Sequence, residues 1–517
     1  MNSHKIFDYT QLTQTQDISC TVCIIGSGAG GATLAAQLTQ QGHDVVMLEA
    51  GSNRYTKHFN MNESEAFTHL YQEGGLRATE DLSISILQGA TLGGSTTINW
   101  TTCFRTPSRI LSIWRKRFGL HKFTDEYLQP YFEKVEKRLN IQPWSEASAN
   151  ENNKVIVNGA KALDWEYSVL RRNVKACANS GYCGMGCPVG AKQGMLLTTI
   201  PDALNAGMRL YCNTHALHLN SSNTQVERVV AEVVDPRTNK ATGVRINVKA
   251  KIVVSSCGAI NGPALFLRSG LNNKNIIGKR TFLHPVIGVA AEFEKPIKGF
   301  YGAPQSISSH QFIDRGQDKI GYFIEVAPTH PILASTAASS FGANQQLFMK
   351  KLSNLSFLIA IHADGIHPED SGGSVSLRPS GRPKISYPVS PLLQEAFSHS
   401  HTSLAKIALA AGAKNCHTMH VQGSLIESNN DIAKLQQQEY GALKHGIFSA
   451  HQMGGLPMGK DPNISIVNPK FRHHTLENLY VVDGSIFPTA LGVNPSQTIY
   501  TLALIASENI HQHLQNI

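Results

Sequence analysis

Residues 20–49, CTVCIIGSGAGGATLAAQLTQQGHDVVMLE, determine the fold class. An apolar run predicts a short strand, an alanine-rich stretch predicts a helix, and a second apolar run predicts another strand. The glycines before the helix have separate uses. Gly26 permits a tight turn, Gly28 lets the backbone approach a pyrophosphate, and Gly31 lets the helix lie close to the strand. The stretch therefore predicts a Rossmann-like βαβ unit.

Glu49 ends the second predicted strand, where a carboxylate can hold the hydroxyls of a ribose. The N-terminus of the predicted helix offers unpaired N–H groups to phosphates. A glycine turn that binds nothing is the alternative, but strand, helix, strand and acid are all in place. The motif predicts a dinucleotide site and does not distinguish FAD from NAD.

The composition is that of an ordinary globular protein of 517 residues, with 41% hydrophobic and 16% charged residues. This length predicts roughly two to four domains. The formal net charge is +9, but no run of five or more Lys or Arg occurs. Nucleic-acid binding would need clustered basic residues, so none is expected.

The N-terminal residues 1–20 are polar and lack an apolar signal core. No apolar stretch approaches the ~18–20 residues that span a bilayer. We expect a cytoplasmic protein, either soluble or attached to a membrane surface as a peripheral protein.

Further segments have a composition suited to a nucleotide site. LQGATLGGSTTINW offers backbone N–H groups with little side-chain bulk. VERVVAEVVD and ATGVRINV flank the turn PRTNK, and KIVVSSC is expected to return as a third strand of a meander. These segments cover residues 87–100 and 226–257, and the C-terminal part adds HQMGGLPMG at 451–459 and NLYVVDGSIFPTALGVNPSQT at 478–498.

With these motifs in this order, the chain resembles the glucose–methanol–choline (GMC) oxidoreductase family along nearly its whole length. The motifs that carry the resemblance are GSGAGG with Glu49, LGGSTTINW, SSCGAINGPALFLRSGL, HQMGG and VVDGSIFP followed by NPSQT. The resemblance implies FAD as cofactor, His451 facing the flavin, and Asn494 as the second catalytic residue. The positions that it implies for FAD binding are Gly26, Gly28, Gly31, Glu49, Gly93, Gly94, Ser95, Asn99, Val226 (through its backbone, at the adenine), Asp483, Gly484 and Asn494.

The implied chemistry is the oxidation of an alcohol to a carbonyl compound. The flavin N5 accepts a hydride, and a base with a pKa near neutrality accepts the hydroxyl proton, which suits His451. The Asn494 amide can hold the substrate oxygen. The chain has 22 histidines, and structural roles are expected for His284, His362, His420 and His445, of which His445 lies close to His451 in sequence.

GGSTTINWTTCFRTP and the cysteine-bearing segment CANSGYCGMGCPVG resemble the long-chain fatty alcohol oxidases, and the ending DGS with LGVNP resembles the cholesterol oxidases. Both point to an apolar substrate, a long-chain primary alcohol or a sterol. The electron acceptor stays open between oxygen, a quinone and a cytochrome. Two rival functions of a flavin-binding chain are a light-driven fatty-acid decarboxylase and a non-catalytic flavin protein, and the His451–Asn494 pair argues against both.

Cys177, Cys183 and Cys187 have the spacing C-x5-C-x3-C-P. An iron–sulfur cluster is one interpretation, although a four-cysteine cluster needs a fourth ligand. Reduced thiols or one disulfide are favoured, and zinc also lacks a fourth ligand nearby. No metal ligand is assigned.

The expected fold class is α/β with an α+β substrate domain. An FAD-binding domain is expected from residues 15–110, 195–290 and 445–517, a flavin-covering excursion with the cysteine segment from 111–194, and a substrate-binding domain from 291–444. In the last, FIEVAP, LSFLIAIHAD, GSVSLRPSG and PKISYP predict strands of an antiparallel sheet. LQEAFSHSHTSLAKIALAAGA predicts a helix.

Overall fold

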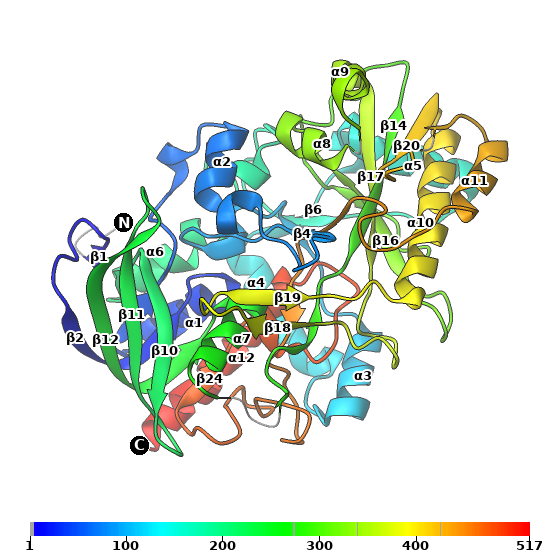
Figure 1. Cartoon of the computed structure of the whole chain (residues 1–517). Helices are drawn as coiled ribbons and strands as arrows, with labels where there is room; N and C mark the ends of the chain where they lie inside the picture. The colour runs from blue at the N-terminus through cyan, green and yellow to red at the C-terminus, as the bar shows by residue number, and fades with distance from the viewer. Residues whose placement is uncertain (1–4, 272–274, 339, 424) are drawn as a thin grey trace.

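The structure is a computed structural model that describes residues 5–517 apart from 272–274, 339 and 424. Its elements form two large sheets, one on the left and one on the right of Figure 1. Each sheet has its own cluster of buried apolar side chains, and a third, smaller cluster lies on the inner face of the right-hand sheet. The mixed α/β fold expected from the sequence is confirmed.

The left-hand sheet contains the predicted Rossmann-like unit. Its strands, in spatial order, are β1 (Ile6–Phe7), β9 (Arg209–Tyr211), β3 (Val45–Leu48), β2 (Gln16–Ile25), β12 (Lys240–Ser255), β11 (Val226–Asp235) and β10 (Thr214–Ser221), with β24 (Leu479–Val481) also paired to β12. The pairs from β1 to β12 and the β12–β24 pair are parallel, whereas β12, β11 and β10 are antiparallel. Helix α1 (Ala29–Gln40) packs against α6 (Thr199–Asn205) and α12 (Ser496–Gln515).

The expected meander differs from the structure in one respect. Residues 240–255 form one 16-residue strand, β12, where two strands were predicted. The first part of β12 pairs with β11, and its C-terminal half pairs with β2, from Ile246 opposite Gln16 to Ser255 opposite Ile25. Lys249 to Lys251, which separate the two apolar runs in sequence, continue the strand because β2 supplies hydrogen bonds through this stretch.

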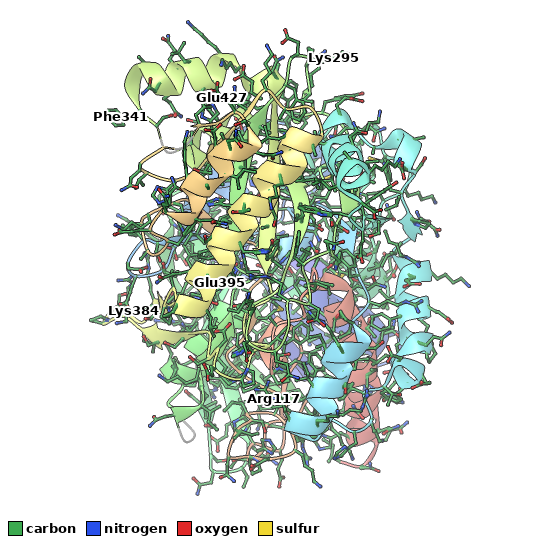
Figure 2. All side chains as sticks on the ribbon, turned by 90° about the vertical axis from the view of Figure 1, so that its right-hand side faces the viewer. Arg117, Lys295, Phe341, Lys384, Glu395 and Glu427 are labelled. Carbon is green, nitrogen blue, oxygen red and sulfur yellow. The ribbon has the colours of Figure 1, made fainter. Side chains whose placement is uncertain are left out.

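The right-hand sheet carries the face on which the second half of the site is built. Its strands are β16 (Tyr322–Ala327), β17 (Leu355–His362), β14 (Val286–Glu292), β20 (Asn415–Thr418) and β21 (Leu425–Ile426), with β22 (Ile447–Ser449) paired to β14 and to β4 (Ile84–Ile86). Helix α10 (Pro391–Ala410) covers the outer face and packs against α5 (Glu151–Leu163). Figure 2 shows α10 running across this face, with Glu395 on it.

The four strands and the helix predicted between 323 and 413 all exist, but the strands do not share one sheet. β18 (Gly373–Leu377) and β19 (Pro383–Ser386) pair in a separate small sheet with β13 (Lys279–Phe282) and β23 (Met453–Gly454). The prediction of a single sheet was wrong because β14, β20 and β22 take the positions beside β17.

The remaining elements connect the sheets or lie on the surface. They are α2 (Glu63–Leu70), α3 (Ser108–Phe118), α4 (Asp125–Arg138), α7 (Gly258–Arg268), α8 (Pro331–Ala337), α9 (Gly342–Lys350), α11 (Ala433–Gln436), β5 (Thr102–Cys103), β6 (Ile141–Pro143), β7 (Ser168–Val169), β8 (Arg171–Asn173) and β15 (Ile307–Ser308). Among the described residues, no helix is both long and apolar enough to cross a bilayer.

The division of the chain into three parts stays a prediction. The border expected at residue 290 lies inside β14, a strand of the right-hand sheet. In the segment 111–194, α4 packs on α12 beside the left-hand sheet, and α5 packs on α10 beside the other.

Two chain segments pass between the small sheet and the right-hand sheet. Residues 282–286 connect β13 to β14, and residues 449–453 connect β22 to β23. β13 pairs with β23 through Phe282 and Met453, and β14 pairs with β22 through Val286 and Phe448. The two connections are therefore held side by side, which brings together one histidine from each.

Candidate active site

The glycine turn after β2 is closely packed except at Gly28. Gly26 has a φ of +102°, and a Cβ there would lie 2.3 Å from the carbonyl oxygen of Ser256. A Cβ on Gly30 would lie 1.8 Å from the oxygen of Val482, and one on Gly31 would lie 2.0 Å from that of Gly26. A Cβ on Gly28 meets nothing within 4 Å. Gly28, at the N-cap of α1, is thus the point where a ligand can approach the backbone.

Glu49 is buried where β3 ends. Its Oε2 accepts hydrogen bonds from the backbone N–H of Ser27 (2.9 Å) and from its hydroxyl (2.5 Å), and Oε1 accepts from the N–H of Gly51 (2.6 Å). Burial raises the pKa of Glu49, and the three hydrogen bonds oppose the shift. The carboxylate is held in place at the wall of the cavity described below, as a ribose-binding acid requires.

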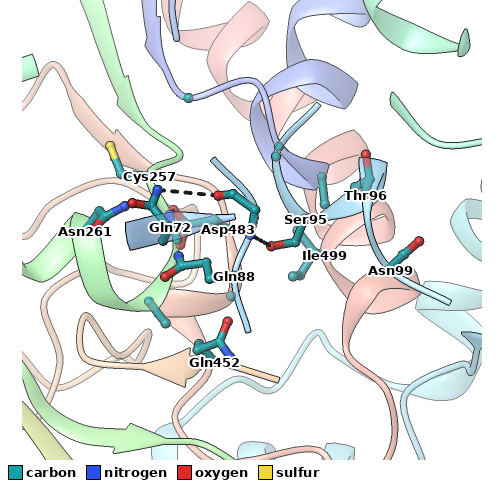
Figure 3. Close-up of a pocket in the computed structure, with 18 of the residues that line it drawn as sticks. Gln72, Gln88, Ser95, Thr96, Asn99, Cys257, Asn261, Gln452, Asp483 and Ile499 are labelled. Atoms are coloured by element: carbon teal, nitrogen blue, oxygen red, sulfur yellow. Dashed lines mark hydrogen bonds between the residues drawn. The ribbon is translucent and has the colours of Figure 1, made fainter. Parts of the chain in front are cut away.

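The loop at residues 89–99 is fastened to the glycine turn. The hydroxyl of Ser27 accepts a hydrogen bond from the N–H of Gly93 (2.9 Å), and Ser95 Oγ accepts one from Gly89 (2.9 Å; Figure 3). A Cβ on Gly94 would lie 3.1 Å from the Cα of Gly28. The glycines of this loop therefore allow two backbone segments to approach each other where the sequence predicts the phosphates.

Asp483 joins the C-terminal part of the chain to the start of α7. Its Oδ1 accepts from the N–H of Ser485 (2.7 Å) and its Oδ2 from that of Gly258 (2.8 Å; Figure 3). Burial raises the pKa of Asp483, and these hydrogen bonds oppose the shift. Gly484, the next residue, lies at the cavity wall.

One cavity of about 280 Å³ connects these features, and its size is that of a small-molecule site. Most of the residues expected to bind the cofactor or substrate line it, namely Gly26, Gly28, Glu49, Gly94, Ser95, Asn99, His451, Asp483, Gly484 and Asn494. Gly31 and Gly93 lie behind the wall and support it. Gln72, Gln88, Asn261 and Gln452 also line the cavity (Figure 3), and no sequence motif pointed to these amides.

Val226 does not line the cavity, which argues against its expected contact with adenine. The side chain of Asn478 occupies both of its backbone polar groups: Oδ1 accepts from the N–H of Val226 (2.7 Å), and Nδ2 donates to its C=O (2.9 Å). The backbone beside Glu49 at this end of the cavity is that of Thr214, His215 and Ala216 in β10.

His451 and Asn494 meet at the other end of the cavity. Asn494 Nδ2 lies 3.2 Å from His451 Nε2. Burial lowers the pKa of His451 to about 4, so the ring is neutral near pH 7 and one nitrogen has a free lone pair. The neighbouring cavity wall includes the apolar side chains of Val286, Ile359, Ile361 and Phe448, together with Thr102 and Gln305.

His284, for which a structural role was expected, contacts the predicted catalytic histidine. Its Nδ1 lies 3.2 Å from His451 Nδ1, and its Nε2 accepts a hydrogen bond from the N–H of Gly492 (3.2 Å). Burial lowers its pKa well below the usual range. Because the two histidines come from segments 167 residues apart, the contact depends on the pairing of strands and could not be read from the sequence.

Asp364 fixes the backbone that carries His284. His284 has a φ of +46°, which a residue with a side chain rarely adopts. Asp364 Oδ1 accepts from the N–H of His284 (3.0 Å), and Oδ2 accepts from Leu283 N–H (2.8 Å) and from the Tyr387 hydroxyl (2.5 Å). Burial raises the pKa of Asp364 to about 7. These bonds hold the strained residue beside His451.

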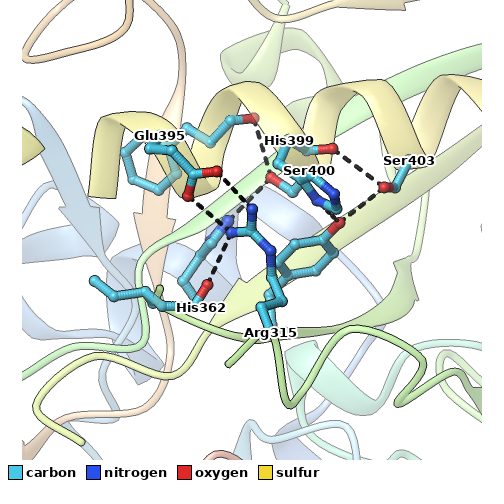
Figure 4. A network of polar contacts seen from close by, with 9 residues as sticks. Arg315, His362, Glu395, His399, Ser400 and Ser403 are labelled. Carbon is cyan, nitrogen blue, oxygen red and sulfur yellow. Dashed lines mark hydrogen bonds and ion pairs between the residues drawn. The ribbon is translucent and has the colours of Figure 1, made fainter. Parts of the chain in front are cut away.

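The other histidines named from the sequence lie away from the cavity wall. His362 Nε2 contacts Ser400 Oγ (3.0 Å), and its Nδ1 contacts the carbonyl oxygen of Pro285 (2.8 Å; Figure 4). His445 packs against Phe397, and His420 Nε2 contacts the carbonyl oxygen of Glu439. These surroundings fit structural roles.

Cys177, Cys183 and Cys187 line a separate small pocket as free cysteines. Within the described parts of the chain, no group of three or more His, Cys, Asp or Glu side chains is arranged to hold a metal ion. Lys192 lies in the same pocket and donates to the carbonyl oxygens of Thr97 (2.8 Å) and Asn99 (2.7 Å). The segment therefore supports the loop at 89–99, and the iron–sulfur interpretation stays a prediction that iron analysis would test.

The residues present fit a flavin dinucleotide. The phosphate and ribose end of the cavity is formed by the open position at Gly28, the helix N-terminus, the fixed carboxylate of Glu49 and the glycine loop. Asn99 Oδ1, a buried oxygen with no hydrogen-bond partner among the described residues, lies at the same cavity. The cavity continues to His451 and Asn494, so a bound dinucleotide would have its redox-active ring near this pair.

Comparisons with known proteins agree with this geometry. Sequence profiles of the GMC oxidoreductase family match residues 67–286 and 368–503, and a profile of an NAD(P)-binding Rossmann-like domain matches residues 24–56. A long-chain-alcohol oxidase of Arabidopsis thaliana is 29% identical over 95% of this chain and 68% of its own length. An uncharacterised GMC-type oxidoreductase of Sinorhizobium fredii is 28% identical over 97% of this chain and 96% of its own.

Solved structures share the fold at low sequence identity. Pyridoxine 4-oxidase from Mesorbium loti has a TM-score of 0.70 and 17% identity, covering 96% of this chain and 99% of its own. A formate oxidase structure also has a TM-score of 0.70, with 13% identity over 97% of this chain and 100% of its own.

Fold and site together define a flavin-dependent oxidoreductase whose cofactor is FAD. The chain belongs to the GMC oxidoreductase family. It is an enzyme of the FAD-dependent alcohol oxidase or dehydrogenase class, as the sequence motifs predicted.

Proposed function

We propose that this enzyme oxidises an apolar alcohol, a long-chain primary alcohol or a sterol, to the corresponding carbonyl compound. The observation that carries the proposal is the neutral His451 beside Asn494, at the end of the cavity with an apolar wall. The name of the Arabidopsis relatives, long-chain-alcohol oxidases, supports the substrate class.

The bound FAD supplies the acceptor for the hydride that leaves the alcohol carbon. His451 accepts the hydroxyl proton at Nε2. The amide Nδ2 of Asn494, which contacts Nε2 in the structure, donates to the alcohol oxygen when substrate is present. Burial lowers the pKa of His451 and keeps it unprotonated above a pH of about 4. Fixing the alcohol between these two groups is the protein's main contribution to the rate.

The test is anaerobic mixing of the FAD-loaded enzyme with a panel of alcohols and sterols in the dark, followed by the absorbance of oxidised flavin. We expect an apolar primary alcohol or a sterol to bleach the flavin, and His451→Ala to slow bleaching by at least ~100-fold. His445→Ala is the matched control, because this buried histidine does not line the cavity. Equal rates in His451→Ala and the wild type would refute the role of His451.

The same experiment separates the rival functions. Bleaching in the dark excludes a light-driven fatty-acid decarboxylase as the sole activity, and failure of every alcohol to bleach the flavin supports a non-catalytic flavin protein. Adding oxygen, a quinone or a cytochrome to the reduced enzyme then identifies the electron acceptor from the rate of reoxidation.

Peripheral attachment to a membrane and residence in the cytoplasm stay predictions. The exposed apolar side chains of Ile332, Phe341 and Leu347 lie on or beside α8 and α9, next to Lys350 and Lys351. We propose this surface as the contact, and cosedimentation with anionic vesicles tests it. Phe341→Ser should reduce the bound fraction if the surface makes the contact.

A further inference from the structure

Two buried oxygen atoms beside the proposed catalytic pair have no hydrogen-bond partner among the described residues. They are Oδ1 of Asn494 and Oε1 of Glu325. Glu325 is fully buried in β16, directly opposite Ile359 of β17, which lines the cavity. Side chains of paired residues point to the same face of a sheet. Glu325 therefore lies on the inner face, within hydrogen-bond reach of the Asn494 side chain, and neither the sequence motifs nor the proposed mechanism uses it.

The second oxygen of Glu325 is already occupied by a donor. Gln305 Nε2 donates to Glu325 Oε2 at 2.6 Å, and the hydroxyl of Thr102 donates to Gln305 Oε1 at 2.8 Å. Thr102 thus fixes the orientation of the Gln305 amide, so that its NH₂ faces the carboxyl. A proton on the carboxyl must then reside on Oε1, the oxygen without a partner.

The surroundings favour the neutral carboxyl near pH 7. Burial raises the pKa of Glu325 to about 8, and a side-chain hydrogen bond with Asn494 opposes the shift. The titratable groups around the inner face are His284, His310 and His451, whose pKa values burial lowers, and Arg109. None of them is among the causes of the shift at Glu325.

The charged groups on the outer face are directed away from Glu325. His362 in β17 and His399 in α10 surround Tyr322, whose side chain leaves β16 on the opposite face. Arg315 and Glu395 form an ion pair there (Figure 4). Helix α5 also packs on β16 from that side, and its Glu151 and Lys154 pair with each other at the surface.

We propose that Glu325 is a positioning residue that donates, as a neutral carboxyl, a hydrogen bond to Asn494 Oδ1. This bond turns Asn494 Nδ2 toward His451 and keeps the lone pair of His451 Nε2 available to the alcohol proton. This inference rests on the proposed alcohol oxidation. One hydrogen bond accounts for both unpartnered oxygens, and the amide orientation it requires is the one in the structure, with Nδ2 at 3.2 Å from Nε2.

Ionisation of Glu325 reverses this arrangement. A carboxylate has no proton to give and attracts Asn494 Nδ2, so the amide turns and presents Oδ1 to His451. Nε2 must then carry the ring proton and cannot accept another. The N–H of Gly492 donates to His284 Nε2, which leaves the proton of His284 on Nδ1, next to His451 Nδ1. This contact favours a lone pair on His451 Nδ1, so it acts against the neutral carboxyl of Glu325, which favours a lone pair on Nε2. The charge of Glu325 therefore decides which tautomer of His451 prevails.

The experiment is the pH dependence of anaerobic flavin reduction in FAD-loaded enzyme carrying Glu325→Gln or Glu325→Leu. In the wild type the maximal rate should fall as pH rises through about 8. Glu325→Gln keeps a donor for Asn494 Oδ1 and an acceptor for Gln305, so it should keep at least about a third of the maximal rate and lose the alkaline decline. Glu325→Leu leaves Oδ1 without a donor and should lower the maximal rate by about tenfold, with little change in the alcohol concentration for half-saturation.

Glu395→Gln, a carboxyl on the outer face, is the control and should retain the wild-type profile. An unchanged alkaline decline in Glu325→Gln would overturn the inference while leaving the proposed function intact. If no alcohol reduces the wild-type enzyme, the proposed function fails first.

Infrared difference spectra supply a measurement that does not depend on turnover. The wild type minus Glu325→Gln spectrum at pH 6 should contain the carbonyl stretch of a protonated carboxylic acid, and the band should vanish as pH rises through about 8. A carboxylate band at pH 6 in its place would refute the neutral Glu325.

Discussion

On the outer face of β16 and β17, the buried polar side chains named above satisfy one another, and on the inner face they do not. Tyr322 contacts His399 (2.7 Å) and Ser403 (2.8 Å), and both ring nitrogens of His362 have partners (Figure 4). On the inner face, Glu325 Oε1 and Asn494 Oδ1 have no partner among the described residues apart from each other, and they can bond only while Glu325 carries a proton. When every buried polar group has a partner, a single arrangement of hydrogen bonds is stabilised. When some groups lack a partner, two arrangements of the hydrogen bonds can be close in energy. The same sheet thus has a structural face and a face suited to proton transfer.

The largest effect that can test this difference is the pH dependence of stability. Folded Glu325 has a pKa of about 8, whereas an unfolded glutamate titrates near 4.3, so the folded state binds the extra proton between these values. Wild-type stability should therefore fall as pH rises from 5 to 8, by about 2–4 kcal/mol more than that of Glu325→Gln. Urea unfolding at both pH values measures it.

Glu395→Gln is the matched change on the outer face. Glu395 is half exposed but its partner Arg315 is buried, so Glu395→Gln should cost about 1–3 kcal/mol and keep the wild-type dependence on pH. Equal slopes for the wild type and Glu325→Gln would contradict the raised pKa.

Two buried histidines on opposite faces give the second test. His284→Ala should lower the rate of flavin reduction by about tenfold, because His451 loses the ring that packs edge-on against it and holds it in place. His362→Ala should leave the rate of the folded enzyme unchanged and lower its melting temperature, since it removes the bonds to Ser400 and Pro285. Stopped-flow reduction and thermal unfolding of both variants test whether the two faces have different roles. A similar loss of rate in both variants would contradict different roles for the two faces.

Two tyrosine hydroxyls give the smallest test. Tyr387→Phe removes a bond to Asp364, which holds His284, and Tyr322→Phe removes bonds to His399 and Ser403. Each should cost about 1 kcal/mol of stability. Only Tyr387→Phe should also reduce the rate, by roughly two- to threefold, because it loosens the backbone at His284. A change of rate in Tyr322→Phe alone would contradict the assignment of the inner face to catalysis and the outer face to stability.

The parts of the site that lie within one motif could be predicted from the sequence. Gly26, Gly28 and Glu49 belong to a local strand–turn–helix–strand pattern, and His451 and Asn494 followed from a family resemblance that the profiles confirm. Glu325 and His284 could not be found in this way. A glutamate within the apolar run FIEVAP gives no sign of which face it occupies until the pairing of β16 with β17 is known.

The errors in the fold have a similar origin. The length of β12 depends on β2 as a pairing partner, and the separate small sheet depends on β14 taking the place beside β17. Val226 matched a position in the family, but the hydrogen bonds from Asn478, 252 residues away, use its backbone. Pairings between distant segments decide these points, and a local pattern does not encode them.

The strand β12 has a consequence for biosynthesis. It joins β2, made first, to β24 at residues 479–481, and the loop that carries Asn494 follows β24. A nascent chain therefore exposes the unpaired edge of β12 until nearly all of the described residues have been synthesised. Pairing across such distances is slow and favours aggregation while it is incomplete. The cofactor cavity closes only once the loop after β24 is in place, so the supply of FAD at that moment should influence how much of the protein reaches the folded state.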